Sequence, residues 1–316
     1  MMKNFKLKLV VLSTLSCLAS GQALADWENL PATGVSVSGG TSPYILCNPT
    51  GNFGSGSGPD KPVQPTSTTD KCAVLPATNS TVPDPNFTFF SGVPVVNRTT
   101  PIVMNNSYTN NTNITVGQLR EYVWRRSTGG GNYQCIYGMQ VTMSNTDYNL
   151  NADESQYFEI NDMARKGWSG KTIDIAYSTV PANASPTYRA GRTFTAVQHR
   201  PETGYVAQPL TGLGSSPAIN GVNVYPTPSG EPTAAQQQAD VNADWVDFTT
   251  DVNYKDDDGS TNPASGMQYV RTSCSSGSFT TSADAIRLRQ TFQENSGDGV
   301  TPNPFIEVQV EGVIPN

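Results

Sequence analysis

The densest group of acidic side chains lies in residues 240–258, immediately before Gly259. Calcium takes six to eight oxygen ligands, which several Asp and Asn side chains on one turn can supply. We therefore predict a calcium site at the ligands Asp251, Asn253, Asp256 and Asp258. The spacing is not that of an EF-hand, because Tyr254 stands where the first ligand before Gly259 would lie. The alternative is a solvated hairpin turn, since Asp-Gly pairs are common in such turns.

A second chemistry open to this chain is glycoside hydrolysis, which needs two carboxylates about 5–10 Å apart and no histidine. The carboxylates expected on or near strands are Glu121, Glu154, Glu159, Asp162 and Asp174. A sugar could stack on a face formed by Trp124, Trp168 and Trp245. The alternative for these rings is packing within the sheets, where aromatic residues at strand spacing are common.

Other reaction classes have little support in the sequence. His199 is the only histidine, so a His-rich metal site is excluded and one His-based catalytic centre is the most the chain could hold. Neither a phosphate-binding P-loop nor a G-x-S-x-G nucleophile elbow is present. The formal charge of −7, from 26 acidic and 19 basic residues, argues against binding nucleic acid.

The first 25 residues have the pattern of a cleaved signal peptide. Lys3, Lys6 and Lys8 precede an apolar run over residues 9–19, and Ala23-Leu24-Ala25 forms a peptidase site before Asp26. No later stretch approaches the roughly 20 apolar residues of a membrane-spanning helix. We expect an exported protein without a transmembrane segment, located in the periplasm, at the cell surface or in the medium.

The cysteines support the same compartment. Cys17 lies in the leader, and the remaining four are Cys47, Cys72, Cys135 and Cys274. An even number in an exported chain indicates two disulfides, for which three pairings are possible. We favour Cys47–Cys72, because it closes a loop rich in Gly and Pro, and hence Cys135–Cys274.

Alternation of apolar and polar residues predicts strands in the middle of the chain and at its C-terminus. It is clear at residues 119–126, 133–143, 171–177, 192–199, 286–289 and 306–311. In the C-terminal hairpin we expect Arg289 to pair with Glu307 on the solvent face. The fold class predicted is all-β, an antiparallel β-sandwich or jelly-roll-like domain with long polar loops and two disulfides.

The expected organisation has three parts. Residues 1–25 are the signal peptide, and residues 26–85 form an N-terminal extension with a loop rich in Gly, Pro, Ser and Thr. Residues 86–316 form the sandwich, interrupted by a long loop at about residues 207–243 that is almost free of charge.

Four segments resemble exported bacterial β-rich proteins of the "choice-of-anchor" kind. They are residues 188–195 (YRAGRTFT), 245–253 (WVDFTTDVN), 256–259 (DDDG) and 269–274 (YVRTSC), within a region of resemblance over residues 116–274. The resemblance implies a surface or secreted location and a β-rich fold, and it brings no catalytic residues. This sequence departs from those proteins in showing no C-terminal anchor.

Together these features predict a non-enzymatic exported protein of a bacterial envelope or extracellular matrix, structural or adhesive and stabilised by calcium. Its expected partners are a surface glycan or other envelope and matrix proteins. The alternative is a secreted carbohydrate-binding module or a glycoside hydrolase that uses paired carboxylates. A third hypothesis, a secreted hydrolase, depends on His199 alone.

Overall fold

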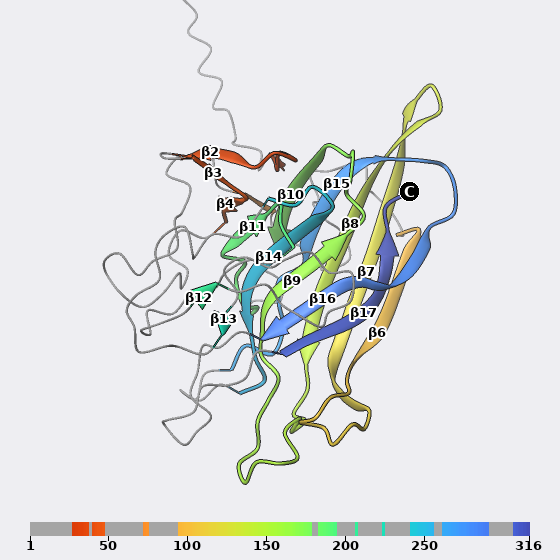
Figure 1. The fold of residues 1–316 in the computed structure, drawn as a ribbon. Helices are drawn as coiled ribbons and strands as arrows, with labels where there is room; N and C mark the ends of the chain where they lie inside the picture. Colours follow the sequence, from red (N-terminus) through yellow and green to blue (C-terminus); the bar gives the residue numbers. More distant parts are fainter. Residues whose placement is uncertain are drawn as a thin grey trace, which may run out of the picture.

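The computed structural model describes residues 27–37, 40–47, 72–75, 94–178, 183–194, 206–207, 223–224, 241–255, 261–290 and 306–316. Within these ranges the regular secondary structure consists of strands, and the predicted all-β class is confirmed. No helix in this part of the chain is long and apolar enough to cross a membrane. Two large sheets, called here the first and the second sheet, pack against each other (Figure 1).

The first sheet has seven strands. Its order is β1 (Glu28–Asn29), β10 (Ile173–Ser178), β15 (Gln268–Cys274), β8 (Asn132–Met143), β7 (Ile114–Gly129) and β6 (Val96–Met104), with β5 (Ala73–Leu75) beside β10. Neighbours are antiparallel except β5, which runs parallel to β10.

The second sheet has six strands. Its order is β17 (Ile306–Ile314), β16 (Thr280–Gln290), β9 (Ile160–Lys166), β14 (Trp245–Val252), β11 (Arg189–Gly191) and β4 (Tyr44–Leu46). Two small ribbons pair β2 (Val35–Val37) with β3 (Gly40–Ser42) and β12 (Val206–Ala207) with β13 (Asn223–Val224). The second ribbon lies where a long loop was expected, and most of that loop is outside the described residues.

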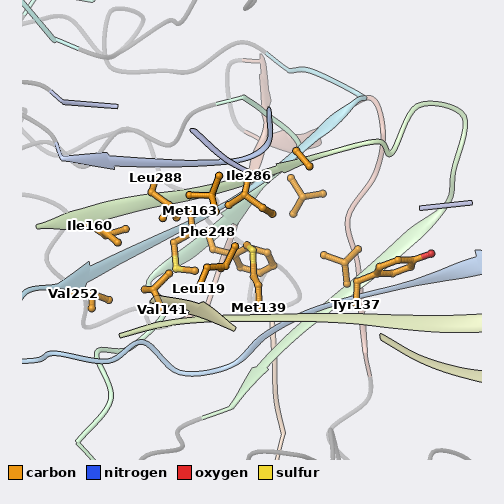
Figure 2. Packing of buried hydrophobic residues seen from close by; sticks show 14 of the residues in the cluster. Leu119, Tyr137, Met139, Val141, Ile160, Met163, Phe248, Val252, Ile286 and Leu288 are labelled. Atoms are coloured by element: carbon orange, nitrogen blue, oxygen red, sulfur yellow. The ribbon is translucent and has the colours of Figure 1, made fainter. Parts of the chain in front are cut away.

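The core lies between the two sheets, where side chains of alternate residues meet. Leu119 and Val123 of β7 face it, as do Tyr137, Met139 and Val141 of β8, and Met163, Phe248 and Leu288 approach from the second sheet (Figure 2). All are at most 1% exposed. The alternation in the sequence therefore identified the inward face of these strands.

The strands β7 and β8 form a long hairpin that extends past its neighbours (Figure 1). Its turn contains Gly129, Gly130 and Gly131, with φ of 94°, 59° and 82°. Residues other than glycine rarely adopt a positive φ, so three successive glycines suit the turn.

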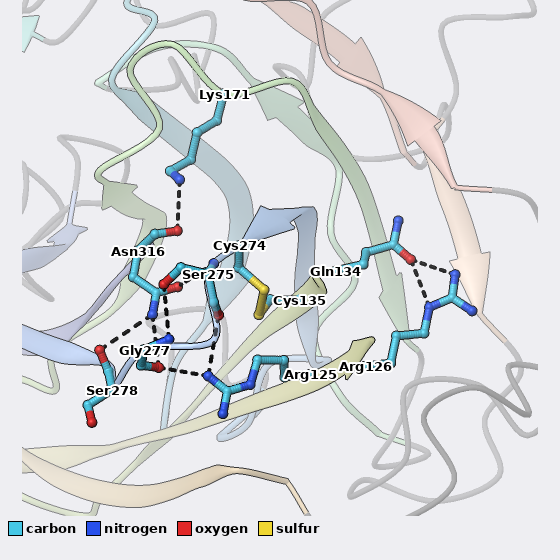
Figure 3. The surroundings of a disulfide bond; sticks show 10 residues. All are labelled: Arg125, Arg126, Gln134, Cys135, Lys171, Cys274, Ser275, Gly277, Ser278 and Asn316. Atoms are coloured by element: carbon cyan, nitrogen blue, oxygen red, sulfur yellow. Dashed lines mark hydrogen bonds between the residues drawn. A yellow bond between two sulfur atoms is a disulfide. The ribbon is translucent and has the colours of Figure 1, made fainter. Parts of the chain in front are cut away.

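Both predicted disulfides are present. Cys47, which follows β4 of the second sheet, is bonded to Cys72, which precedes β5 of the first. Cys135 and Cys274 join the adjacent strands β8 and β15 (Figure 3). One bridge therefore connects the two sheets, and the other connects distant parts of the sequence within one sheet.

Two expectations need correction. Arg289 is opposite Glu307 in the register of β16 and β17, as predicted, but both side chains are at most 1% exposed. The pair is therefore buried, not solvated. The strand expected over residues 192–199 also differs at its start, because β11 ends at Gly191 and residues 192–194 form a bend; residues 195–199 lie outside the described residues.

Candidate functional site

The base of the acidic turn is formed by residues at the end of β14. Asn253 and Asn262 make an antiparallel bridge, and the Asn253 Oδ1 accepts a hydrogen bond of 3.4 Å from the Asn262 amide. Asp251 is half-buried, and Asn253 is buried. Asp256 and Asp258 lie outside the described residues, and within those ranges no three His, Cys, Asp or Glu gather to hold a metal. The calcium site remains a prediction.

Two carboxylates considered for acid–base chemistry are held by arginines on opposite faces of the first sheet. Glu121 points into the core, where its Oε1 lies 3.0 Å from the Arg165 guanidinium and accepts a hydrogen bond from the Val313 amide. Asp174 pairs with Arg271 at 2.7 Å. Each carboxylate therefore has a charged partner within the fold.

The other three candidates also lie apart from these two. Asp162 is fully buried on β9, with Arg289 as its register partner on β16. Glu159 is buried and accepts a hydrogen bond from the Asn161 side-chain amide, whereas Glu154 is exposed in a loop. The structure therefore places the five carboxylates in different surroundings, on two sheets and a loop.

A network of buried charges covers the outward face of the second sheet. The Arg289 Nε donates to the Glu307 carboxylate at 2.8 Å, and its Nη1 lies 3.6 Å from Asp247. Arg287 binds the same Glu307. The Phe194 ring centroid is 4.2 Å from the Arg289 guanidinium. Only the Arg289–Glu307 pair of this network was predicted from the sequence, because the place of Asp247 depends on the order of strands in the sheet.

The three tryptophans proposed for sugar stacking are packing residues in this structure. Trp124 stacks on Tyr122 at 5.3 Å, Trp168 meets Tyr137 edge-to-face, and Trp245 packs against Phe194. None of the three is more than 6% exposed. They therefore present no open stacking face for a sugar.

Trp124 lies close against its own sheet because the neighbouring strand carries a glycine at that point. A Cβ added to Gly138 would be 3.0 Å from the Trp124 ring and 3.2 Å from the Met267 sulfur. The glycine thus permits the close approach of the indole to the backbone of β8.

A pocket lies between the start of β6, β7 and the loop that joins β15 to β16. It has a volume of about 340 Å³ and is lined by Val95, Val96, Arg125, Ser276, Gly277, Ser278 and Phe279. The Arg125 Nη1 donates to the Gly277 carbonyl at 2.7 Å and to the Ser275 carbonyl at 3.4 Å (Figure 3). This arrangement can bind a group that accepts hydrogen bonds. Sequence reasoning missed it because its residues come from three separate segments.

No family model, curated protein or solved structure matches the chain. His199 lies outside the described residues, so the hypothesis of a His-based hydrolase is not tested. Function is therefore inferred from the residues and their arrangement.

Proposed function

We propose that the chain is an exported, non-enzymatic β-sandwich protein of a bacterial envelope or extracellular matrix, with a structural or adhesive role. The observation that carries the proposal is that the two sheets are connected to each other along both edges of the sandwich. On one side the Cys47–Cys72 bridge connects β4 and β5. Disulfides persist outside the reducing cytoplasm, and the two bridges are compatible with the export that the leader predicts.

On the other side ion pairs connect the sheets. Arg98 of β6 lies 2.7 Å from Glu311 of β17 and 3.6 Å from Glu121, which in turn binds Arg165 of β9. A domain that is covalently joined at one edge and bridged by charges at the other suits a protein that must keep its shape where ATP-dependent chaperones are absent.

The positions of the carboxylates support the non-enzymatic part of the proposal. Glu121 and Asp174 are bound to arginines, and Glu159 is buried against an amide. General acid–base catalysis requires a carboxyl group that can reach substrate and exchange a proton. Carboxylates held by charged or amide partners inside the fold suit a structural role better.

The proposal is tested by assaying the purified mature protein both for binding and for turnover. We expect retention on isolated bacterial envelopes or on matrix glycans, and no hydrolysis of a polysaccharide panel above the spontaneous rate. Defined hydrolytic turnover that is lost in Glu159→Gln would indicate a glycoside hydrolase instead. Asp153→Asn, at an exposed loop position outside the candidate carboxylates, is the control.

Calcium at the acidic turn is part of the same proposal. An ion that binds only the folded state stabilises it by about 2.7 kcal/mol at a hundred times its dissociation constant. We expect thermal unfolding to occur at a higher temperature in calcium than in excess chelator, and this difference to vanish in Asp256→Asn/Asp258→Asn. Asp153→Asn, in an exposed loop elsewhere, should leave it intact. An unfolding temperature unaffected by calcium would show that the turn is simply solvated.

A further inference from the structure

The pocket beside the Cys135–Cys274 bridge contains the guanidinium of Arg125. No carboxylate among the described residues lies within 4 Å of the Arg125 guanidinium, although the chain as a whole is acidic. To acceptors among the described residues, Arg125 donates hydrogen bonds only from Nη1. Its Nε and Nη2 donors remain for an acceptor that enters the pocket, and the planar guanidinium matches the two oxygens of a carboxylate.

The guanidinium is held in place before any ligand arrives. It lies 5.3 Å from the Phe279 ring centroid and 5.6 Å from that of Tyr133, and it binds the carbonyls of the loop between β15 and β16. That loop is in turn held by Asn316, whose side-chain amide donates to Gly277 and Ser278 (Figure 3). Binding to a site already ordered loses less conformational entropy.

The rest of the lining is suited to a small apolar group with polar contacts at its rim. Val95 is 49% exposed, which is unusual for a large aliphatic side chain in this structure, and Val96 and Phe279 provide further apolar wall. Ser276 and Ser278 are exposed and contribute hydroxyl groups. A volume of about 340 Å³ is within the range of small-ligand pockets.

We propose that this pocket binds a carboxylate attached to a small apolar group, with Arg125 pairing with the carboxylate and Val95, Val96 and Phe279 contacting the apolar part. The carboxylate could belong to a free organic acid or to the C-terminus of a partner polypeptide. The inference is independent of the structural or adhesive role, since it depends only on the pocket.

The experiment is an NMR titration of the oxidised mature protein, monitored at the Gly277 and Phe279 amides. Phenylacetate is compared with phenylacetamide, and a short peptide ending in leucine with a free carboxylate is compared with its C-terminal amide. We expect saturable shifts with the acids and none with the amides. The acid that binds more tightly shows whether the carboxylate comes from a free organic acid or from a polypeptide C-terminus. Equal binding of acids and amides, or no response to either acid, would overturn the proposal.

Variants test the role assigned to the guanidinium. Arg125→Gln should weaken binding of the acid about tenfold or more, because a hydrogen bond to a charged group is lost. Arg120→Gln, on the same strand at an exposed outward position, should leave the affinity unchanged. Unchanged affinity in Arg125→Gln would contradict the assignment.

A second variant retains Arg125, so it tests the charge pairing even if Arg125→Gln does not fold. Val95→Glu places a carboxylate at an exposed position beside the pocket, where it can compete for the guanidinium. It should weaken acid binding about tenfold, whereas Val95→Gln, similar in size and neutral, should have a much smaller effect. Equal effects of Glu and Gln would show that charge pairing does not govern the site.

Discussion

Glu121 and Arg165 are opposite charges in an otherwise apolar core. Their side chains are at most 1% exposed and 3.0 Å apart, and burial lowers the pKa of the Arg165 guanidinium because desolvation disfavours its charge. The desolvation of two charges offsets much of their attraction, so the pair adds little compared with apolar residues. Removing Arg165 is different, because Glu121 then stays buried and keeps only Arg98, 3.6 Å away, as a charged partner.

This asymmetry gives a prediction for Arg165. Arg165→Met should lower the free energy of unfolding by about 3–5 kcal/mol, and adding Glu121→Gln should recover part of that loss. Lys166→Met is the control, since the neighbouring Lys166 pairs with Asp284 near the surface and should cost less than about 1 kcal/mol. Denaturant unfolding measures all three. A loss in Arg165→Met no greater than in Lys166→Met would contradict this role for the pair.

Buried tyrosines predict how stability depends on alkaline pH. Desolvation raises the pKa of Tyr137 and Tyr188 to about 12 and raises that of Tyr148 as well. Between about pH 10 and 12 the folded state therefore holds protons that the unfolded state releases, and stability falls as pH rises. Arg165, Arg189 and Arg192 act in the opposite direction, because desolvation lowers the pKa of each guanidinium, that of Arg192 to about 10. The contribution of the tyrosines is therefore measured by substituting a single tyrosine.

We expect denaturant unfolding at pH 8, 10 and 11 to show that each of these tyrosines makes stability fall more steeply, or rise less, above pH 10. Each of these tyrosines contributes at most about 1.4 kcal/mol per pH unit. Tyr137→Phe should reduce the slope, since phenylalanine does not titrate. A pH dependence unchanged by this substitution would show that Tyr137 does not contribute to stability at alkaline pH.

At the scale of strands, the alternation of residues predicted which side chains face the core. Ile173, Ile175 and Tyr177 of β10 are all buried on one face, as are Ile286 and Leu288 of β16. Period-two alternation is a local property of a strand, so one sequence suffices to find it. The same alternation does not show whether the other face is covered.

The Arg289–Glu307 pair illustrates this limit. The register was predicted correctly, because two alternating runs joined by a loop pair in few ways. The burial was wrong, because the outward face of the second sheet carries Asp247 from β14 and the Phe194 ring over Arg289. Those residues are distant in sequence, and whether they lie next to Arg289 depends on the order of strands in the sheet.

The two disulfides should differ in their contribution to stability. In the chain-entropy account a bridge stabilises more when it closes a longer loop. The bridges span 25 and 139 residues, for which that account gives about 3.5 and about 5 kcal/mol. Cys135→Ala/Cys274→Ala should therefore cost more than Cys47→Ala/Cys72→Ala in denaturant unfolding. The reverse order would show that the connection between the sheets matters more than loop length.

At the scale of the whole molecule, the fold class and the cysteine pairing could be predicted, but the pocket could not. Cysteine pairing follows from parity and from the loop that most needs ordering. The pocket gathers Val95, Arg125 and Phe279 from separate segments, and Arg125 has no sequence pattern that distinguishes it from Arg126. Carboxylates of the right type were found for catalysis, but their partners depend on the topology of both sheets.

The central claim is that this is an exported sandwich protein held together by two disulfides. The most direct test expresses the full chain in a bacterium, separates cytoplasm from periplasm and medium, and measures the intact mass of the protein. We predict that it is found outside the cytoplasm, begins at Asp26, and is lighter by four hydrogens than the reduced chain. A full-length cytoplasmic protein with free thiols would contradict the account.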